Sequence, residues 1–111
     1  MRRILLALAI TAALAFSSSA AASTEGYRQT NTRVILAVFG KYGQQALAVA
    51  RCESGLTVWA RNGQYLGLFQ MGSSERRIYG HGNDPWAQSR AAYRYFVASG
   101  RDWSPWSCKP W

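Results

Sequence analysis

Residues 46–55 read Ala46-Leu47-Ala48-Val49-Ala50-Arg51-Cys52-Glu53-Ser54-Gly55, an apolar run that leads to one acid and a glycine. Its small and apolar residues suit a helix that packs on a core, and glycine is the usual residue just beyond a helix end. The pattern predicts a helix from Gln44 to Glu53 that stops at Gly55. A single acid therefore stands in the last turn of an apolar helix.

This acid, Glu53, is the only carboxylate between Glu25 and Glu75. Apolar surroundings and the negative end of the helix dipole both raise the pKa of a carboxylic acid, whereas the nearby Arg51 acts to lower it. We expect an acid that stays protonated near neutral pH and is ready to donate its proton. The alternative that this position leaves open is a glutamate paired with an arginine at a helix end.

The remaining elements are predicted from periodicity and turn signals. A helix is expected from Arg33 to Tyr42, capped by Asn31 or Thr32 and stopped by Gly43, and a short one from residue 73 or 74 to 79. Asp84-Pro85 opens a further helix that runs to about residue 99, and its Trp86 can face the core. Asn62-Gly63 predicts a tight turn in an irregular hairpin. The fold class is therefore mainly α, with a short irregular hairpin segment.

The first 30 residues are not expected to belong to this domain. Met1-Arg2-Arg3, the apolar run 4–16 and the small residues up to Ala22 form the pattern of a secretory signal, with cleavage after Ala22. The run is too short to span a bilayer, so a retained membrane anchor or a buried core helix is the weaker alternative. We predict a signal peptide at 1–22, a flexible terminus at 23–30 and one domain at 31–111. The mature protein is expected to be secreted or associated with the cell wall.

Two cysteines, Cys52 and Cys108, would reach an oxidising compartment after export. Only one pairing is possible, and it would close a loop of 56 positions. Such a loop restricts the unfolded state by about 4 kcal/mol. The predicted disulfide ties the C-terminal tail to the residue directly before Glu53.

The formal charge of +8 favours a polyanionic partner such as nucleic acid, anionic lipid or an acidic wall polymer. The arginines are dispersed along the sequence and form no basic arm or continuous basic helix. Dispersal and export together argue against a nucleic-acid reader. We expect anionic cell-wall polymers to be attracted by this charge, and we expect a monomer.

The sequence lacks the residues that several kinds of catalytic or binding site require. His81 is the only histidine and no nucleophile pattern surrounds it, so no catalytic triad is indicated. One histidine and two bridged cysteines make no metal-ligand set, and no glycine-rich phosphate cradle is present. We expect no metal and no cofactor. The group that remains is a carboxylate.

Four segments carry a resemblance: Cys52-Glu53-Ser54-Gly55, Asn62-Gly63 with Tyr65, Gly67-Leu68-Phe69-Gln70-Met71, and Trp103-Ser104-Pro105-Trp106-Ser107-Cys108. Together they resemble the soluble lytic transglycosylase family, and more narrowly the small secreted transglycosylase-like and resuscitation-promoting-factor domains. The resemblance covers most of the chain after the predicted signal. It implies a lysozyme-like fold and cleavage of the β-1,4 bond between N-acetylmuramic acid and N-acetylglucosamine in peptidoglycan.

By position, the resemblance implies that Glu53 is the catalytic acid and that Ser54, Asn62, Tyr65 and Gln70 bind the substrate. Gln70 is the strongest of these binding candidates because an amide both donates and accepts hydrogen bonds. The neighbouring Leu68 and Phe69 are expected in the core. For Trp59, Trp86 and Trp103, sugar stacking and core packing both remain open.

The family reaction needs one acid, whereas most glycosidases pair two carboxylates. Glu53 would protonate the leaving oxygen and then deprotonate the muramoyl 6-hydroxyl, giving a 1,6-anhydro product. Glu25, Glu75, Asp84 and Asp102 show no evident claim to act as a nucleophile. The chain departs from larger relatives in two ways: Phe69 stands where they often carry Met, and their later Ala-Tyr-Asn motif is not present.

Two other functions remain as alternatives. One is a lysozyme-type hydrolase on the same fold, with Asp84 or Asp102 activating water. The other is a non-catalytic, cationic wall-binding module in which charge and tryptophans act alone.

Overall fold

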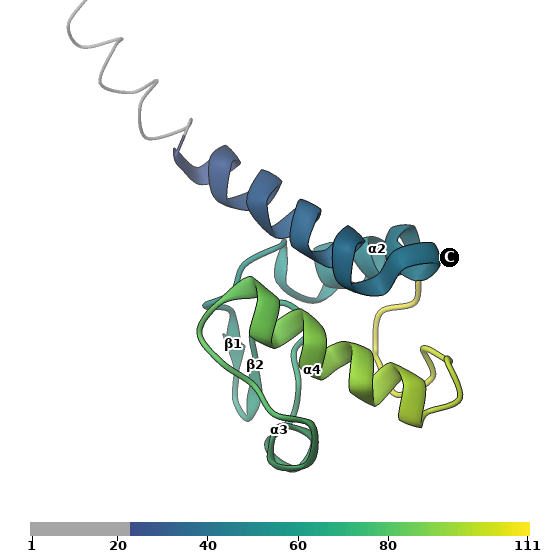
Figure 1. Cartoon of the computed structure of the whole chain (residues 1–111). Coiled ribbons are helices and arrows are strands. Elements are labelled where there is room, and N and C mark those ends of the chain that lie inside the picture. The colour runs from purple at the N-terminus through teal and green to yellow at the C-terminus, as the bar shows by residue number, and fades with distance from the viewer. Residues whose placement is uncertain (1–22) are drawn as a thin grey trace, which may run out of the picture.

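Helices make up most of residues 23–111, the part of the chain that the computed structural model describes (Figure 1). Residues 23–39 are helical, and the further elements are η1 (Gly40–Tyr42), α2 (Gly43–Ser54), β1 (Arg61–Asn62), β2 (Tyr65–Leu66), α3 (Ser73–Tyr79) and α4 (Pro85–Ala98). The chain is therefore mainly α with one short hairpin, as predicted. The predicted signal peptide, residues 1–22, lies outside the described residues.

The first described helix is longer than the sequence predicted. Residues 23–30, expected to form a flexible terminus, are helical, although all of their side chains are exposed. Thr32 does not cap a helix; its hydroxyl donates to the carbonyl of Arg28, one turn back, as that of Thr30 does to Gly26. Asn31 is buried and donates its side-chain amide to the carbonyl of Leu56 at 2.8 Å. The helix therefore passes through the residues that were expected to start it.

The turn into α2 uses two glycines. Gly40 has a φ of 55°, a left-handed conformation that favours glycine. Gly43 was predicted to stop a helix, but it opens α2. A Cβ at Gly43 would lie 3.0 Å from Cδ2 and 3.2 Å from Cα of Leu36, so its small size lets two helices approach closely. The end of α2 is as predicted: Gly55, with a φ of 63°, donates its N–H to the carbonyl of Arg51.

The hairpin turn falls one residue later than Asn62-Gly63 predicted. Asn62 pairs with Tyr65 across the two strands, so Gly63 and Gln64 form the loop. Gly63 has a φ of 58°, which suits a tight hairpin turn. Each strand has two residues, and the segment 57–59 contributes no strand. The hairpin is therefore shorter than expected.

Helix α4 begins where the sequence indicated and holds the hairpin segment in place. Asp84 caps it by accepting from the N–H of Ala87 at 3.0 Å, with Pro85 in the first position. The buried Gln88 accepts from the N–H of Leu68 at 2.9 Å. Its amide also donates to carbonyls of two other loops, those of Val58 and Gly82. A single side chain therefore fixes three irregular segments against α4.

Aromatic rings fill the core between the helices and the tail. Trp103 is 2% exposed and packs against Phe96, with ring centroids 4.4 Å apart, and against Phe39 at 5.7 Å. Leu68 and Phe69 are buried, as predicted. Of the two roles left open for Trp86, core packing does not hold: Trp86 is 43% exposed and lies beside Arg90. Within the described part of the chain, no helix is long and apolar enough to cross a membrane.

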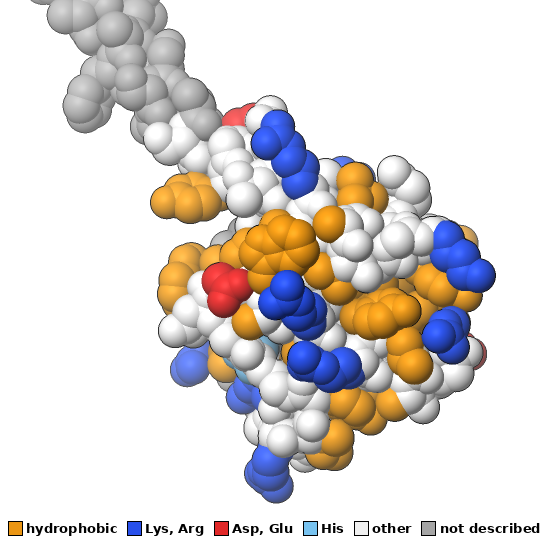
Figure 2. Space-filling model, in the orientation of Figure 1, with side chains coloured by type: hydrophobic (Ala, Val, Ile, Leu, Met, Phe, Trp, Pro, Cys, Tyr) orange, Lys and Arg blue, Asp and Glu red, His pale blue; other side chains and the backbone are white. Residues whose placement is uncertain are grey.

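The basic side chains do not gather into one stripe. Figure 2 shows lysines and arginines spread over the visible face and separated by apolar and neutral side chains. This face agrees with the dispersal that the sequence indicated.

Candidate active site

A cleft of about 340 Å³ lies where α2, the hairpin, α3, α4 and the C-terminal tail meet. This volume is within the range of small-molecule sites. Segments far apart in the sequence contribute its lining, which consists of Cys52, Glu53, Asn62, Tyr65, Gln70, Met71, Gly72, Glu75, Tyr95, Pro105, Trp106 and Ser107. The cleft thus contains Glu53 and three of the four residues predicted to bind substrate.

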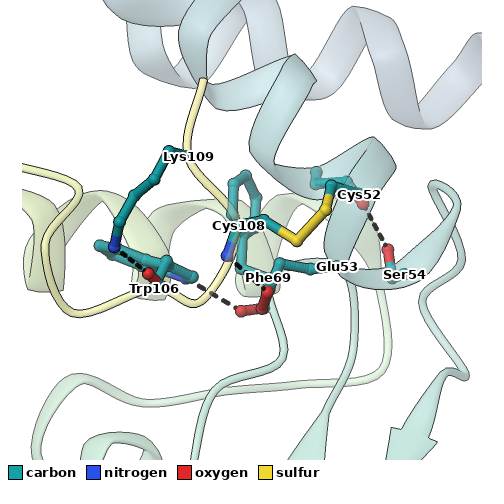
Figure 3. The surroundings of a disulfide bond; sticks show 8 residues. Cys52, Glu53, Ser54, Phe69, Trp106, Cys108 and Lys109 are labelled. Carbon is teal, nitrogen blue, oxygen red and sulfur yellow. Dashed lines mark hydrogen bonds between the residues drawn. A yellow bond between two sulfur atoms is a disulfide. The ribbon is translucent and has the colours of Figure 1, made fainter. Parts of the chain in front are cut away.

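Glu53 is half-buried at the end of α2, and its carboxylate Oε1 accepts the N–H of Cys108 at 3.2 Å (Figure 3). Burial raises the pKa of Glu53, while the bond from Cys108 and the charge of Lys109 act to lower it. The expected direction of the pKa is therefore confirmed. The expected influence of Arg51 on this pKa is not confirmed. Among residues 23–111, Lys109 is the only cation that acts on the Glu53 carboxylate, and no arginine pairs with it.

The predicted disulfide joins Cys52 to Cys108, with the Cα atoms 6.0 Å apart (Figure 3). It brings the tail onto the end of α2 and so places the Cys108 N–H against Glu53. The tail is also anchored by Trp106, whose indole N–H donates to the carbonyl of Phe69 at 2.9 Å. Glu53 consequently lies against a wall that is held covalently and by hydrogen bonds.

An ammonium group organises the loop within that tail. Lys109 Nζ donates to the carbonyls of Trp103 and Ser104, at 3.1 Å each, and to the carbonyl of Trp106. These three carbonyls belong to a segment with no regular secondary structure. The lysine therefore satisfies backbone groups that a helix or strand would otherwise pair.

Gln70 lines the cleft, but its own hydrogen bonds go mostly to the protein. Its amide nitrogen donates to the carbonyls of Ala60, at 3.2 Å, and Gly67, at 3.1 Å. Its oxygen accepts from Asn62 Nδ2 at 3.2 Å. Gln70 therefore shapes the cleft, whereas the exposed Asn62 and Tyr65 are the predicted binding residues with free polar groups.

Ser54 is not a cleft residue. Its hydroxyl donates to the carbonyl of Ala50 at 3.0 Å and accepts from the N–H of Thr57 at 3.2 Å. In Figure 3 it points back along α2 while Glu53 points toward the tail. The expectation that Ser54 binds substrate is replaced by a role in holding the turn that follows α2.

Glu75 is the residue of this cleft that the sequence interpretation missed. It stands in the first turn of α3 and shares the cleft with Glu53, so Glu53 is not the only acid there. The signal was present in the short distance from Gln70 to Glu75, because a helix starting directly after the cleft segment keeps its first turn nearby. Neither Asp84 nor Asp102 lines the cleft: Asp84 caps α4 and Asp102 accepts from the N–H of Ser104.

No metal centre is evident in the described residues. Residues 23–111 contain no group of three or more His, Cys, Asp or Glu side chains placed to hold an ion. His81 is half-buried near Gly67, outside the cleft, and burial and the charge of Arg76 lower its pKa. The polar side chains that line the cleft are two carboxylates, two tyrosines, two amides and a serine.

Comparisons with known proteins return no match: no family model, no curated protein and no solved structure is similar to this chain. A proposal of function consequently depends on the residues and geometry described above.

Proposed function

We propose that this protein is a peptidoglycan lytic transglycosylase with a lysozyme-like arrangement, in which Glu53 is the acid and base. The observation that carries the proposal is the half-buried Glu53, with its pKa raised, in one cleft with Asn62, Tyr65 and Gln70. A carboxylic acid with a raised pKa, in one cleft with hydrogen-bonding amides and a tyrosine, is suited to protonating a glycosidic oxygen. The substrate is peptidoglycan, cleaved at the bond between N-acetylmuramic acid and N-acetylglucosamine.

The reaction follows from one acid acting twice. Glu53 gives its proton to the bridging oxygen, and the bond from that oxygen to the muramoyl anomeric carbon breaks. The Glu53 carboxylate then takes the proton of the muramoyl 6-hydroxyl as that oxygen attacks the same carbon. The product is a 1,6-anhydro sugar, no water is consumed, and Glu53 is protonated again.

Two features support action outside the cell. A disulfide such as Cys52–Cys108 persists in oxidising compartments. The N-terminal residues have the sequence pattern of a secretory signal. Export would bring a cationic protein to an anionic wall, where its charge favours association with the polymer.

One observation favours a second candidate, a hydrolase on the same cleft. Glu75, not Asp84 or Asp102, is the acid that shares the cleft with Glu53. In a hydrolase of this kind the second carboxylate activates a water or attacks the sugar directly. Such an enzyme would leave a reducing end where the transglycosylase leaves an anhydro end.

Digestion of purified peptidoglycan, followed by mass spectrometry of the soluble fragments, tests these functions. The wild type should release anhydro-muropeptides, one water lighter than hydrolysed fragments. Glu53→Gln should lower the rate at least about a hundredfold, because it removes the general acid. Glu25→Gln is the matched control, since Glu25 is exposed and lies outside the cleft.

Each alternative predicts a different outcome of the same digestion. Hydrated, reducing ends that disappear in Glu75→Gln would establish the hydrolase. Full lysis by Glu53→Gln would show that the carboxylate is not catalytic and would support the non-catalytic, cationic wall-binding module.

A further inference from the structure

The wall of the cleft opposite the tail carries a carboxylate, Glu75, that has no assigned role. None of the lysines and arginines between residues 23 and 111 lines the cleft, whereas two of the chain's five acids do. Glu53 has a role in the proposed reaction, but the transglycosylase mechanism does not use Glu75. With Glu53 acting as the proton donor, Glu75 is the group that gives the cleft negative charge, and a negative charge favours a cationic group over a carboxylate.

Glu75 converges with Tyr65 beside Gly72. A Cβ added to Gly72 would lie 2.6 Å from Glu75 Oε2 and 3.3 Å from Tyr65 Cε1. The carboxylate and the ring edge therefore face the same small space, and the absence of a side chain at Gly72 keeps that space open. All three residues line the cleft.

Tyr95 adds a hydroxyl to this group. Its ring packs against Tyr79, with centroids 5.1 Å apart, and against Trp106 at 4.9 Å. Tyr95 lines the cleft, and its hydroxyl is the polar group that it can offer to a ligand there. Burial first, and then the negative charge of Glu75, raise the pKa of Tyr95.

These groups have no partners within the protein. Among residues 23–111, neither the Glu75 carboxylate nor the hydroxyls of Tyr65 and Tyr95 form a hydrogen bond with another protein group. Arg76, the cation next to Glu75, instead donates to the carbonyls of Gln64 and Met71. The carboxylate and both phenols thus remain available to a ligand.

We propose that Tyr65, Glu75 and Tyr95 form a subsite for a primary ammonium group carried by the substrate. The carboxylate supplies charge and a strong hydrogen-bond acceptor, the phenol oxygens supply further acceptors, and the half-exposed Tyr65 ring offers a π face. This inference rests on the proposed function and deepens it. It gives Glu75 a binding role in place of water activation.

Two parts of peptidoglycan carry such a group: a glucosamine that lacks its acetyl group, and a diamino acid of the peptide stem. Binding is measured without cleavage, in the Glu53→Gln background, by calorimetry. The first pair of ligands is a tetramer of N-acetylglucosamine and the corresponding tetramer of glucosamine. The second pair is a muropeptide with a free side-chain amine and the same muropeptide after chemical acetylation of that amine.

The decisive quantity is the ratio of the two Kd values within a pair, compared between Glu53→Gln and Glu53→Gln/Glu75→Gln. This comparison cancels the acetamide contacts, which both proteins share. We expect Glu75 to favour the ammonium ligand of one pair about fivefold, the size of a partly exposed ion pair with an aromatic contribution. The pair that shows the effect identifies the sugar amine or the stem amine.

Added salt should reduce the preference, because the pair is partly exposed. Tyr65→Leu should reduce it as well, and Glu25→Gln should leave it unchanged. Equal ratios with and without Glu75 in both pairs would overturn the ammonium subsite while leaving the role of Glu53 intact. Failure of every ligand to bind would contradict the subsite and the proposed function together.

Discussion

The two walls of the cleft are built in opposite ways. The tail wall, Pro105, Trp106 and Ser107, has no helix or strand, yet a disulfide, an ammonium group and an indole N–H fix it. The opposite wall contains regular elements, the hairpin and α3, but its strands have two residues each and side-chain amides hold it together. Regular secondary structure is therefore no measure of how firmly a site is held.

The difference matches what each wall does in the proposed enzyme. The catalytic acid contacts the tail wall, because Glu53 accepts from the N–H of Cys108. An acid that transfers protons to a bond needs fixed geometry, since small displacements cost much of the rate. The proposed binding groups Asn62 and Tyr65 are exposed on the opposite wall, where adjustment to a polymer is tolerated.

Among the changes that test this difference between the two walls, removal of the disulfide should have the largest effect on stability and on cleavage. In Cys52→Ala/Cys108→Ala the unfolded chain regains the freedom of a 56-position loop, so the free energy of unfolding should fall by about 4 kcal/mol. The tail wall would also lose its tie to α2, and cleavage should fall with it. Urea denaturation and peptidoglycan digestion measure the two losses.

Reduction of the wild type with a thiol should reproduce the double variant. An unfolding free energy within about 1 kcal/mol of the oxidised protein would show that the hydrogen bonds of Trp106 and Lys109 hold the tail without the disulfide.

The opposite wall should respond more mildly to the loss of its central amide. Gln70→Leu removes the bonds to Ala60 and Gly67, but each of those carbonyls keeps a backbone N–H donor, from Gly67 and Gln70 respectively. The expected loss is therefore about 1–2 kcal/mol of unfolding free energy, together with weaker substrate binding. Denaturation and the KM for soluble glycan fragments test it.

Asn62→Ala is the control for Gln70→Leu. It deletes one bond from an exposed side chain, so its stability should change by no more than about 0.5 kcal/mol. A larger loss in Asn62→Ala than in Gln70→Leu would show that the hairpin, and not Gln70, holds this wall.

The sequence predicted the elements whose signals are local. Asp84-Pro85 and Gly55 mark helix ends through their own capping and φ preferences, and both predictions are confirmed. Asn31 failed as a helix start, because burial and a bond to Leu56, 25 residues away, override its capping tendency. Trp86 is not a core residue either. The tail supplies the buried tryptophans Trp103 and Trp106, and periodicity within one helix cannot show this.

The candidate site likewise contains residues that the sequence could predict and residues that it could not. The disulfide Cys52–Cys108 was predictable because two cysteines allow one pairing. The resemblance indicated Asn62, Tyr65 and Gln70 as site residues, and all three line the cleft. Glu75 was set aside because its place depends on how α3 packs against the hairpin. The contact of Lys109 with three carbonyls depends on a loop with no sequence signature, so nothing in the chain order predicts it.

Substitution of Lys109 should have the smallest of the expected effects, and it tests most directly how the tail wall acts on Glu53. The Lys109 charge and the Cys108 N–H both lower the pKa of Glu53, against the larger effect of burial. Lys109→Met removes the charge and loosens the loop that presents the N–H, so both changes raise this pKa further. Because the first step needs protonated Glu53, cleavage is lost as the pH rises through its pKa, and the alkaline limb should move to higher pH.

Lys109→Arg separates the two contributions, because it keeps the positive charge while a planar guanidinium fits the three converging carbonyls poorly. If charge alone matters, the alkaline limb of the arginine variant should coincide with that of the wild type; if the loop geometry matters, it should lie between the wild type and Lys109→Met. The Glu53 carboxyl resonance, followed by NMR during titration, reports the same order without any turnover. An alkaline limb that stays in place in Lys109→Met, with an unchanged carboxyl titration, would show that the tail fixes Glu53 in space but does not set its proton affinity.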